Sequence, residues 1–386
     1  MNVHLLLLLI GVIAASVQAF TPQRSFGLRN SIIKSTTAED IGAVGSKLTN
    51  VELAKEALAL WVNADEIEQV KMEATEGGVN NIVQYVELPG GDKKLLRIYN
   101  NGLDTQRVTV EHEVLALLHE QAPGLSFAVP KMIPAKNGDN KTFCTLSNGA
   151  EACLVDLIPG VLPKLTCVEA IGRASGELNT ALSKLDGVTS VCNVEPYSDM
   201  WGNHHAVNRE NFIEMMNGPD FDGKLRPFAD FMLEYTLEMD KKIESTYEAL
   251  PTQLIHGDLH QDNILVKDNK VTGCLDFEFA MYDYRAMEIA ICLSKYAGEE
   301  KALEYFEEFI SGYAETGVLT AAEAEAVPDL INLRVLSNVV YFVGRAIAKE
   351  DSIESLTSRI ENYTGRIKWQ NDNADAVINM IKSKMT

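Results

Sequence analysis

The sequence predicts an α+β fold of two lobes, with a β-rich first lobe (the N-lobe) and a mainly helical second lobe (the C-lobe). Short strand-like stretches separated by turn residues occupy the chain up to Ile158, and helical patterns dominate it from Cys167 onward. Pro159 and Gly160 stand between the two regions as a short linker. The 386 residues are 46% hydrophobic and 23% charged, which is enough apolar material for a large core or two lobes.

The N-lobe, residues 46–160, is expected to begin with one helix and to continue with strands. Thr49 and Glu52 have the spacing of a capping box, and the run rich in Ala and Leu that follows continues a helix to Trp61. A Pro-Gly-Gly-Asp turn separates the last two of three strands, and a helix follows the third. We expect strands at Ile67–Met72, Ile82–Leu88 and Leu95–Tyr99, a helix at Arg107–His119, and two more apolar runs within Phe143–Ile158.

The C-lobe, residues 161–386, shows apolar residues at helical spacing in most of its segments. The exception is Leu254–Phe277, which reads as two short strands around the polar loop Lys267–Lys270 and predicts one hairpin. We expect helices at Val168–Leu185, Phe228–Leu250, Tyr284–Tyr296, Ala302–Tyr313, Ala321–Ile347 and Ile353–Ile381.

The first 45 residues have the composition of targeting segments. Residues 1–19 contain an apolar run that is too short to span a bilayer, followed by small residues placed for cleavage after Ala19, and they predict a signal peptide. Residues 20–45 are rich in Ser, Thr and basic residues, with no acid before Glu39, so we expect a disordered transit-like segment. The combination resembles the bipartite presequence of algae with secondary plastids and predicts import into a plastid, with secretion as the alternative.

The net charge argues against two classes of partner, and the cysteine spacing bears on disulfide bonding and metal binding. A formal net charge of −21 without a basic stripe argues against nucleic acid, because binding a polyanion relies on clustered Lys and Arg. The same acidity disfavours anionic membranes, and we expect no stable membrane anchor. The six cysteines are scattered without metal-ligand spacing, so we interpret them as free thiols, with a disulfide-bonded secreted form as the alternative.

The densest cluster of reactive side chains runs from His256 to Val266 and continues at Asp276. Asp258 and Asn263 have the spacing H-x-D-x-x-x-x-N of a kinase catalytic loop, and Asp276 follows after one hairpin. Phosphoryl transfer from ATP requires one carboxylate that orients the attacking hydroxyl, and an amide oxygen and a second carboxylate that hold Mg²⁺. The cluster therefore predicts Asp258 as the catalytic residue and Asn263 and Asp276 as metal ligands.

Structural roles are the alternative for each residue of this cluster. Asp and Asn in a polar loop often bind their own backbone, although the flanking strands favour the catalytic interpretation here. We interpret His256 as a buried residue that braces the loop. The role of His260 stays open.

The N-lobe offers residues for the nucleotide. Gly77, Gly78 and Asn81 belong to a loop between two strands, where glycine lets backbone N–H groups approach phosphates, although a plain hairpin turn explains the loop equally well. Arg97 lies on a strand face opposite its apolar neighbours and is a candidate for binding ATP phosphates. Glu111 on the next helix is a candidate partner of Arg97, with Glu113 as the alternative; a solvated surface charge is the other interpretation of each.

The motifs together resemble the aminoglycoside phosphotransferase and choline kinase superfamily. The similarity rests on Leu254–Leu293, supported by Gly77–Asn81, Leu96–Tyr99 and Leu157–Gly160. It implies a protein-kinase-like fold and the cofactors ATP and Mg²⁺. The resemblance assigns the catalytic base to Asp258, the magnesium ligands to Asn263 and Asp276, phosphate binding to Arg97, a position near metal or substrate to Glu278, and a bracing role to Glu288.

Two branches of this superfamily share features with the sequence. Asp276–Arg285 resembles the choline and ethanolamine kinase motif, but the tryptophan-bearing segment that surrounds a quaternary ammonium group in choline kinases is not found downstream. Cys153–Gly160, the segment around Gly172, and Ile289–Leu293 look more like type II homoserine kinases. Asn179 and the Arg334–Arg345 region depart from that pattern.

The expected substrate is a small hydroxylated metabolite, either an amino alcohol or an amino acid such as homoserine, with choline or ethanolamine as the alternative. Candidate substrate contacts are Asp262, Glu278, Asp283 and Arg285; the three acids would suit an amine-bearing acceptor, although solvated surface charge explains them equally well. An alternative from another class is a nucleotide-binding pseudokinase, but no metal ligand is missing. A protein kinase is not supported, because no A-P-E activation segment follows Asp276.

Overall fold

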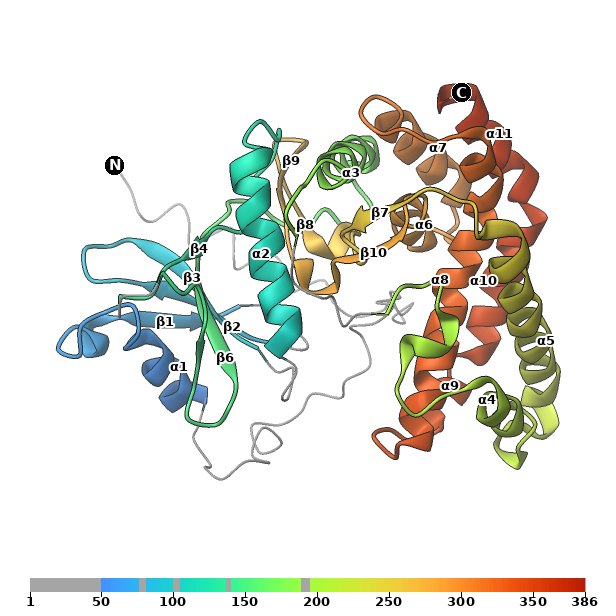
Figure 1. The fold of residues 1–386 in the computed structure, drawn as a ribbon, viewed down its shortest axis with the longest axis horizontal. Helices are drawn as coiled ribbons and strands as arrows, with labels where there is room; N and C mark the ends of the chain where they lie inside the picture. The colour runs from blue at the N-terminus through green and yellow to red at the C-terminus, as the bar shows by residue number, and fades with distance from the viewer. Residues whose placement is uncertain (1–49, 76–80, 100–104, 137–139, 189–194, 386) are drawn as a thin grey trace, which may run out of the picture.

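The computed structural model describes residues 50–75, 81–99, 105–136, 140–188 and 195–385. The predicted signal peptide, the transit-like segment, Gly77 and Gly78 lie outside the described residues. The described chain has a sheet-containing part and a mostly helical part (Figure 1), and the segment 157–160 between them belongs to no helix or strand. The predicted lobe boundary near residue 160 therefore falls in this segment.

The N-lobe is built on an antiparallel sheet with strand order β1-β2-β3-β6-β4, and β5 pairs with β6. Three buried residues on successive strands, Val86, Leu96 and Leu154, pack with Leu58 of the helix α1 (Asn50–Leu58). Alternation of side chains along β3 places Arg97 on the other face, beside Cys153, its register partner. The strands are β1 (Lys71–Ala74), β2 (Ile82–Glu87), β3 (Lys93–Ile98), β4 (Met132–Ile133), β5 (Cys144–Thr145) and β6 (Glu151–Asp156).

The helix α2 (Thr105–Gln121) covers the Arg97 face, where Val108 packs with Tyr99, Cys153 and Val155. Figure 1 shows α2 between the sheet and the C-lobe. The predicted bounds of the first N-lobe strand were wrong. The stretch predicted as a strand at Ile67–Met72 begins with a 3-10 turn, η2 (Ile67–Gln69), which is closed by a hydrogen bond from the Val70 N–H to the Ile67 carbonyl, and β1 starts only after it.

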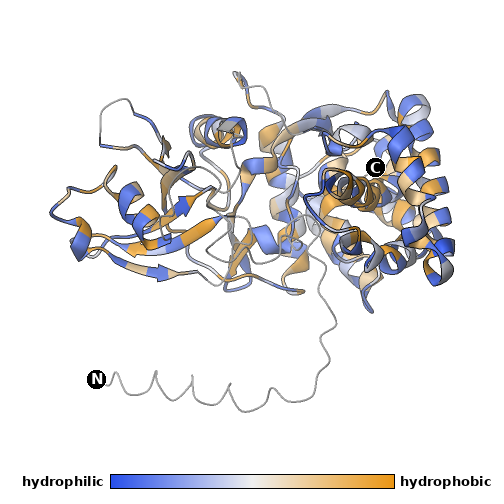
Figure 2. Cartoon of the chain, turned by 90° about the horizontal axis from the view of Figure 1, so that it is seen from below, coloured by the Kyte–Doolittle hydropathy of each residue, from blue (hydrophilic) through white to orange (hydrophobic). Residues whose placement is uncertain are grey.

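The helix α8 (Ala321–Ile347) forms the centre of the C-lobe and is buried along most of its length. Its length and hydropathy would suit a membrane span, but 78% of its apolar window is buried against the rest of the chain, as expected of a core helix. Apolar residues gather where the C-lobe helices face one another, which Figure 2 shows in orange. The surrounding helices are α3 (Val168–Leu182), α4 (Arg209–Met216), α5 (Arg226–Lys242), α6 (Met287–Ser294), α7 (Ala302–Tyr313), α9 (Glu354–Thr357), α10 (Ile360–Asp372) and α11 (Ala374–Met385).

Two short antiparallel ribbons lie between the sheet and these helices. The strands β8 (Ile264–Lys267) and β9 (Lys270–Cys274) form the expected hairpin. The strand β7 (Thr252–Ile255) pairs instead with β10 (Met281–Tyr284), which lies within a stretch that was not predicted as a strand. The chain between β7 and β8 is therefore a loop held at both ends by paired strands, and it carries the residues predicted to be catalytic.

Candidate active site

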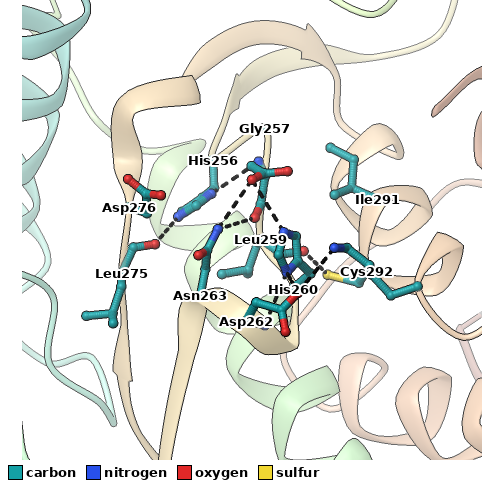
Figure 3. A network of polar contacts seen from close by, with 12 residues as sticks. His256, Gly257, Leu259, His260, Asp262, Asn263, Leu275, Asp276, Ile291 and Cys292 are labelled. Atoms are coloured by element: carbon teal, nitrogen blue, oxygen red, sulfur yellow. Dashed lines mark hydrogen bonds and ion pairs between the residues drawn. The ribbon is translucent and has the colours of Figure 1, made fainter. Parts of the chain in front are cut away.

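The loop between β7 and β8 holds Asp258 and Asn263 together. The amide nitrogen of Asn263 donates to the Asp258 carbonyl oxygen at 2.9 Å and lies 3.4 Å from its carboxylate, so the amide oxygen points away from Asp258. The Leu275 N–H donates to the Asn263 carbonyl at 2.8 Å, which ties the loop to the residue before Asp276. Figure 3 shows Asn263 and Asp276 on the two segments that this bond connects.

His256 and Glu288 support this loop from inside the protein. The His256 Nδ1 accepts from the Asp258 N–H at 3.3 Å, so Nε2 carries the proton and donates to the Leu275 carbonyl at 2.9 Å (Figure 3). Burial lowers the pKa of His256 and keeps the ring neutral. The Glu288 carboxylate on α6 accepts from the His256 N–H at 2.6 Å, and burial raises its pKa to about 7. Both residues thus contact the backbone of the loop, and their bracing role stays a prediction.

Asp258 is a buried carboxylate held by cationic and imidazole groups. It is 1% exposed, and its oxygens lie 3.0 Å from Nη2 of Arg334 on α8 and 3.4 Å from Nε2 of His260. Burial opposes ionisation, but His260, Arg334 and Lys295 together hold the pKa of Asp258 well below its usual range. Asp258 is therefore ionised at neutral pH and is suited to accept a hydrogen bond from a hydroxyl group.

Arg97 joins the N-lobe to the segment after β9. Its Nη1 lies 2.9 Å from the Glu111 carboxylate, and its Nη2 lies 2.8 Å from Asp276 and 3.1 Å from Glu278. Of the two candidate partners, Glu111 on α2 contacts Arg97, and the Tyr99 hydroxyl donates to Glu111 at 2.9 Å. The arrangement brings residues from β3, α2 and the loop after β9 to one point.

The same place gathers carboxyl oxygens that fit a divalent cation. Three carboxylates, Glu111, Asp276 and Glu278, face the single guanidinium of Arg97. Burial raises the pKa of Glu278 to about 8, and nearby Asp276 adds to the effect while Arg97 opposes it. The Asp276 side chain keeps 20% of its surface exposed, so a cation can reach it. Carboxylate and amide oxygens are the donors that Mg²⁺ prefers, and Asn263 and Asp276 supply them here.

The structure brings only part of the predicted substrate set to this network. Asp262 is half exposed and lies 3.3 Å from Lys295, beside His260. The buried Asp283 carboxylate instead accepts from the backbone N–H groups of Tyr197 and Tyr284, both at 2.7 Å. Asp283 therefore holds the backbone in place, because its oxygens are used inside the protein. Asn81 is near the site, with its amide nitrogen 3.5 Å from Glu278.

Arg285 is also placed away from Asp258. It forms an ion pair with Glu323 in the first turn of α8. Arg334, which contacts Asp258, lies three turns further along the same helix, about 16 Å at the usual rise per residue. Arg285 thus connects the end of β10 to the start of α8.

Two residues of the network, Arg334 and Lys295, were missed by the motif reasoning. Arg334 is 0% exposed in the middle of a largely buried helix, and Lys295 directly follows the buried helix α6. A charge inside a buried helix requires a partner, so the pattern alone could have flagged Arg334 as a functional or pairing residue. The partner could not be predicted, because Asp258 lies 76 residues away.

Comparisons with known proteins show which family the chain resembles. A model described as the phosphotransferase enzyme family matches residues 71–325. The chain is 28% identical to a homoserine kinase of Sinorhizobium medicae and 33% identical to one of Sinorhizobium fredii; each match covers 63% of this chain and 73% of the relative.

Solved structures with the same fold include two small-molecule kinases. A microcompartment-associated aminopropanol kinase has a TM-score of 0.60 at 17% identity, covering 85% of this chain and 98% of the other. The ethanolamine kinase of Plasmodium vivax has a TM-score of 0.57 at 15% identity, covering 92% and 98%. The predicted two-lobed, protein-kinase-like fold is thereby confirmed.

Proposed function

The chain belongs to the phosphotransferase enzyme family and is a small-molecule kinase, and from this premise we propose that it transfers the γ-phosphoryl group of ATP to the hydroxyl of homoserine. The observation that carries the proposal is the connected set of Asp258, Asn263 and Asp276, with Arg97 beside it. The homoserine kinases among its sequence relatives support the choice of acceptor, with a simple amino alcohol as the alternative.

In the proposed reaction Asp258 accepts a hydrogen bond from the acceptor hydroxyl and aims its oxygen at the γ-phosphorus. A new bond forms between that oxygen and phosphorus, the bond to the bridging oxygen of ADP breaks, and the hydroxyl proton passes to Asp258. The lowered pKa of Asp258 makes orientation its main contribution, because a weak base takes the proton late.

Asn263 and Asp276 would hold Mg²⁺, and Glu278 would support them. A bound Mg²⁺ would neutralise the charge that develops on the phosphate oxygens. Arg97 would bind the ATP phosphates while Glu111 keeps its guanidinium in place. Because Asp258 is 1% exposed, binding of the acceptor requires the side chains that cover it to move apart.

The proposal is tested by ADP formation on the full chain with Mg-ATP and a panel of acceptors: homoserine, ethanolamine, choline and 3-amino-1-propanol. We expect turnover with homoserine. Turnover with choline or ethanolamine alone would move the assignment to that branch, and ATP binding without turnover of any acceptor would support a pseudokinase instead.

We also propose that residues 1–45 direct the protein to a plastid, on the basis of their two-part composition. A fluorescent protein fused after residue 45 should enter plastids of an alga with secondary plastids. Its secretion into the medium would contradict the proposal and favour the alternative.

A further inference from the structure

Two consecutive histidines and a glutamate gather beside the C-terminal end of α8. One ligand atom from each of His204, His205 and Glu350 lies within 4.8 Å of the other two. The rings of His204 and His205 are stacked with their centroids 4.4 Å apart, and Nε2 of His204 lies 3.3 Å from the Glu350 carboxylate. The three side chains thus offer two nitrogens and one oxygen to a common point.

The backbone fixes one of these ligands and leaves the other two able to adjust. His204 follows the 3-10 turn η3 (Met200–Asn203), is 8% exposed, and packs so closely on α8 that a Cβ at Gly344 would lie 2.5 Å from the His204 Cβ. His205 and Glu350 are exposed. A metal ion could therefore draw two surface side chains toward a buried and immobile imidazole.

The donor set indicates which metal the cluster suits. Zn²⁺ is commonly bound by imidazole nitrogens and carboxylate oxygens, with three protein ligands and a water molecule in the fourth position. Mg²⁺ prefers oxygen ligands, so it suits Asn263 and Asp276 and not a pair of imidazoles. Burial lowers the pKa of His204, which keeps its ring uncharged at neutral pH, the form that binds a metal.

Metal binding would displace two existing contacts. The Ala206 N–H donates to Nδ1 of His204 at 3.2 Å, so Nε2 carries the proton and donates to Glu350. Zn²⁺ at Nε2 would move this proton to Nδ1 and break the bond from Ala206, which is one long hydrogen bond given up for three metal–ligand bonds. Glu350 also contacts Arg345 at 3.0 Å, but Arg345 keeps Asp351 as a partner at 2.6 Å.

We propose that His204, His205 and Glu350 bind one Zn²⁺ ion, which fastens segment 195–208 to the end of α8. The same segment carries Tyr197, whose hydroxyl donates to the carbonyl of Gly257 at 2.9 Å, next to the candidate catalytic residue. The ion would thus stabilise a part of the chain that supports the catalytic loop. Its ligands share no residue with the candidate magnesium site, so the inference does not depend on the proposed kinase reaction.

Zinc binding by the full chain tests the inference. After removal of metals with a chelator, calorimetric titration with Zn²⁺ in excess Mg²⁺ should show one ion bound per chain. Excess Mg²⁺ occupies sites built from oxygen ligands alone. His205→Gln and Glu350→Gln should each weaken the binding about tenfold or more, because even groups that only orient a metal ligand contribute that much.

Matched variants and thermal unfolding serve as controls. His119→Gln and Glu354→Gln change an exposed histidine and an exposed glutamate elsewhere and should bind Zn²⁺ like the unmodified protein. A large excess of Zn²⁺ should raise the Tm of the unmodified protein by about 2–4 °C and leave that of His205→Gln almost unchanged. Equal Tm values of the zinc-free proteins would show that His205→Gln folds normally.

Two outcomes overturn the inference. The first is that the unmodified chain binds no Zn²⁺ under these conditions. The second is that zinc binds with the same affinity to His205→Gln and Glu350→Gln, as it would if cysteine thiols held it. Either outcome leaves the proposed phosphoryl transfer standing, and an absence of turnover does not affect the zinc measurements.

Discussion

At the scale of single residues, the charge at Arg97 is the most consequential feature of the site. One guanidinium, 11% exposed, contacts carboxylates from α2 and from the loop after β9. It therefore links the two lobes and pairs with three carboxyl groups that lie close together. Removing one partner from such a buried group leaves uncompensated charge in a region with little water.

Arg97→Met should lower the free energy of unfolding by about 3–5 kcal/mol, the usual cost of breaking a buried ion pair from one side. Added Mg²⁺ should recover part of this loss in the variant, because a divalent cation would replace the missing positive charge. Urea unfolding with and without Mg²⁺ measures both effects. As a control, Arg173→Met removes a largely exposed pair with Glu315 and should cost at most about 1 kcal/mol. Equal stability of the two variants would contradict the account.

Glu151, at the start of β6, gives a pH-dependent prediction away from the candidate site. Burial raises its pKa to about 7, from an ordinary value of 4.5. In this range the folded protein binds more protons than the unfolded chain, so the contribution of Glu151 to stability is present below about pH 4.5 and is lost as the pH rises toward 7. Glu151→Gln should remove that loss. The free energies of unfolding of the unmodified protein and of Glu151→Gln, measured between pH 5 and 8, should be similar at low pH and differ at high pH. A constant difference across this range would exclude this role.

At the scale of elements, the packing of α3 against α7 depends on very close backbone approach. A Cβ added at Gly172 would lie 2.0 Å from the Phe309 carbonyl oxygen, a distance that real atoms do not adopt. The two helices could accommodate it only by moving apart, and their contact supports the β7 and β9 strands next to the catalytic loop.

Gly172→Ala should therefore destabilise the protein by about 1–3 kcal/mol or more, as overpacking usually does. Gly365 on α10 is the matched control, because a Cβ there meets nothing within 4 Å. Gly365→Ala should leave stability unchanged or raise it by up to about 1 kcal/mol, since alanine favours helices. Thermal unfolding of both variants checks the prediction. If Gly172→Ala leaves the stability unchanged, α3 and α7 can accommodate a methyl group between them, and the prediction is wrong.

The elements also show which parts of the fold the sequence could predict. The helix α8 has the predicted bounds, Ala321–Ile347, because its apolar pattern is long and its first turn carries a capping box with Thr320. The pairing of β7 with β10 was not predicted, because short apolar runs indicate a strand without indicating its partner. Local signals therefore predicted the longest buried helix well, but they missed α4 and merged α9, α10 and α11 into one helix. They did not indicate which strands pair.

At the scale of the whole molecule, the site lies around the two ribbons, which stand between the N-lobe sheet and α8 (Figure 1). Motif spacing grouped Asp258 with Asn263 and offered Glu111 as one of two partners of Arg97, and the structure has both contacts because each pair lies within one loop or on adjacent elements. It did not reveal Arg334 or Lys295, whose closeness to the loop depends on how the C-lobe helices pack. The roles of all these residues in catalysis stay predictions.

The central claim is that Asp258 orients the acceptor for phosphoryl transfer. The most direct test is product formation by the full chain with Mg-ATP and homoserine, compared with Asp258→Asn. We predict that the variant still binds Mg-ATP but forms phosphorylated product about 10²–10⁴ times more slowly. Turnover of the variant within a few-fold of the unmodified enzyme, with nucleotide binding intact, would contradict the account.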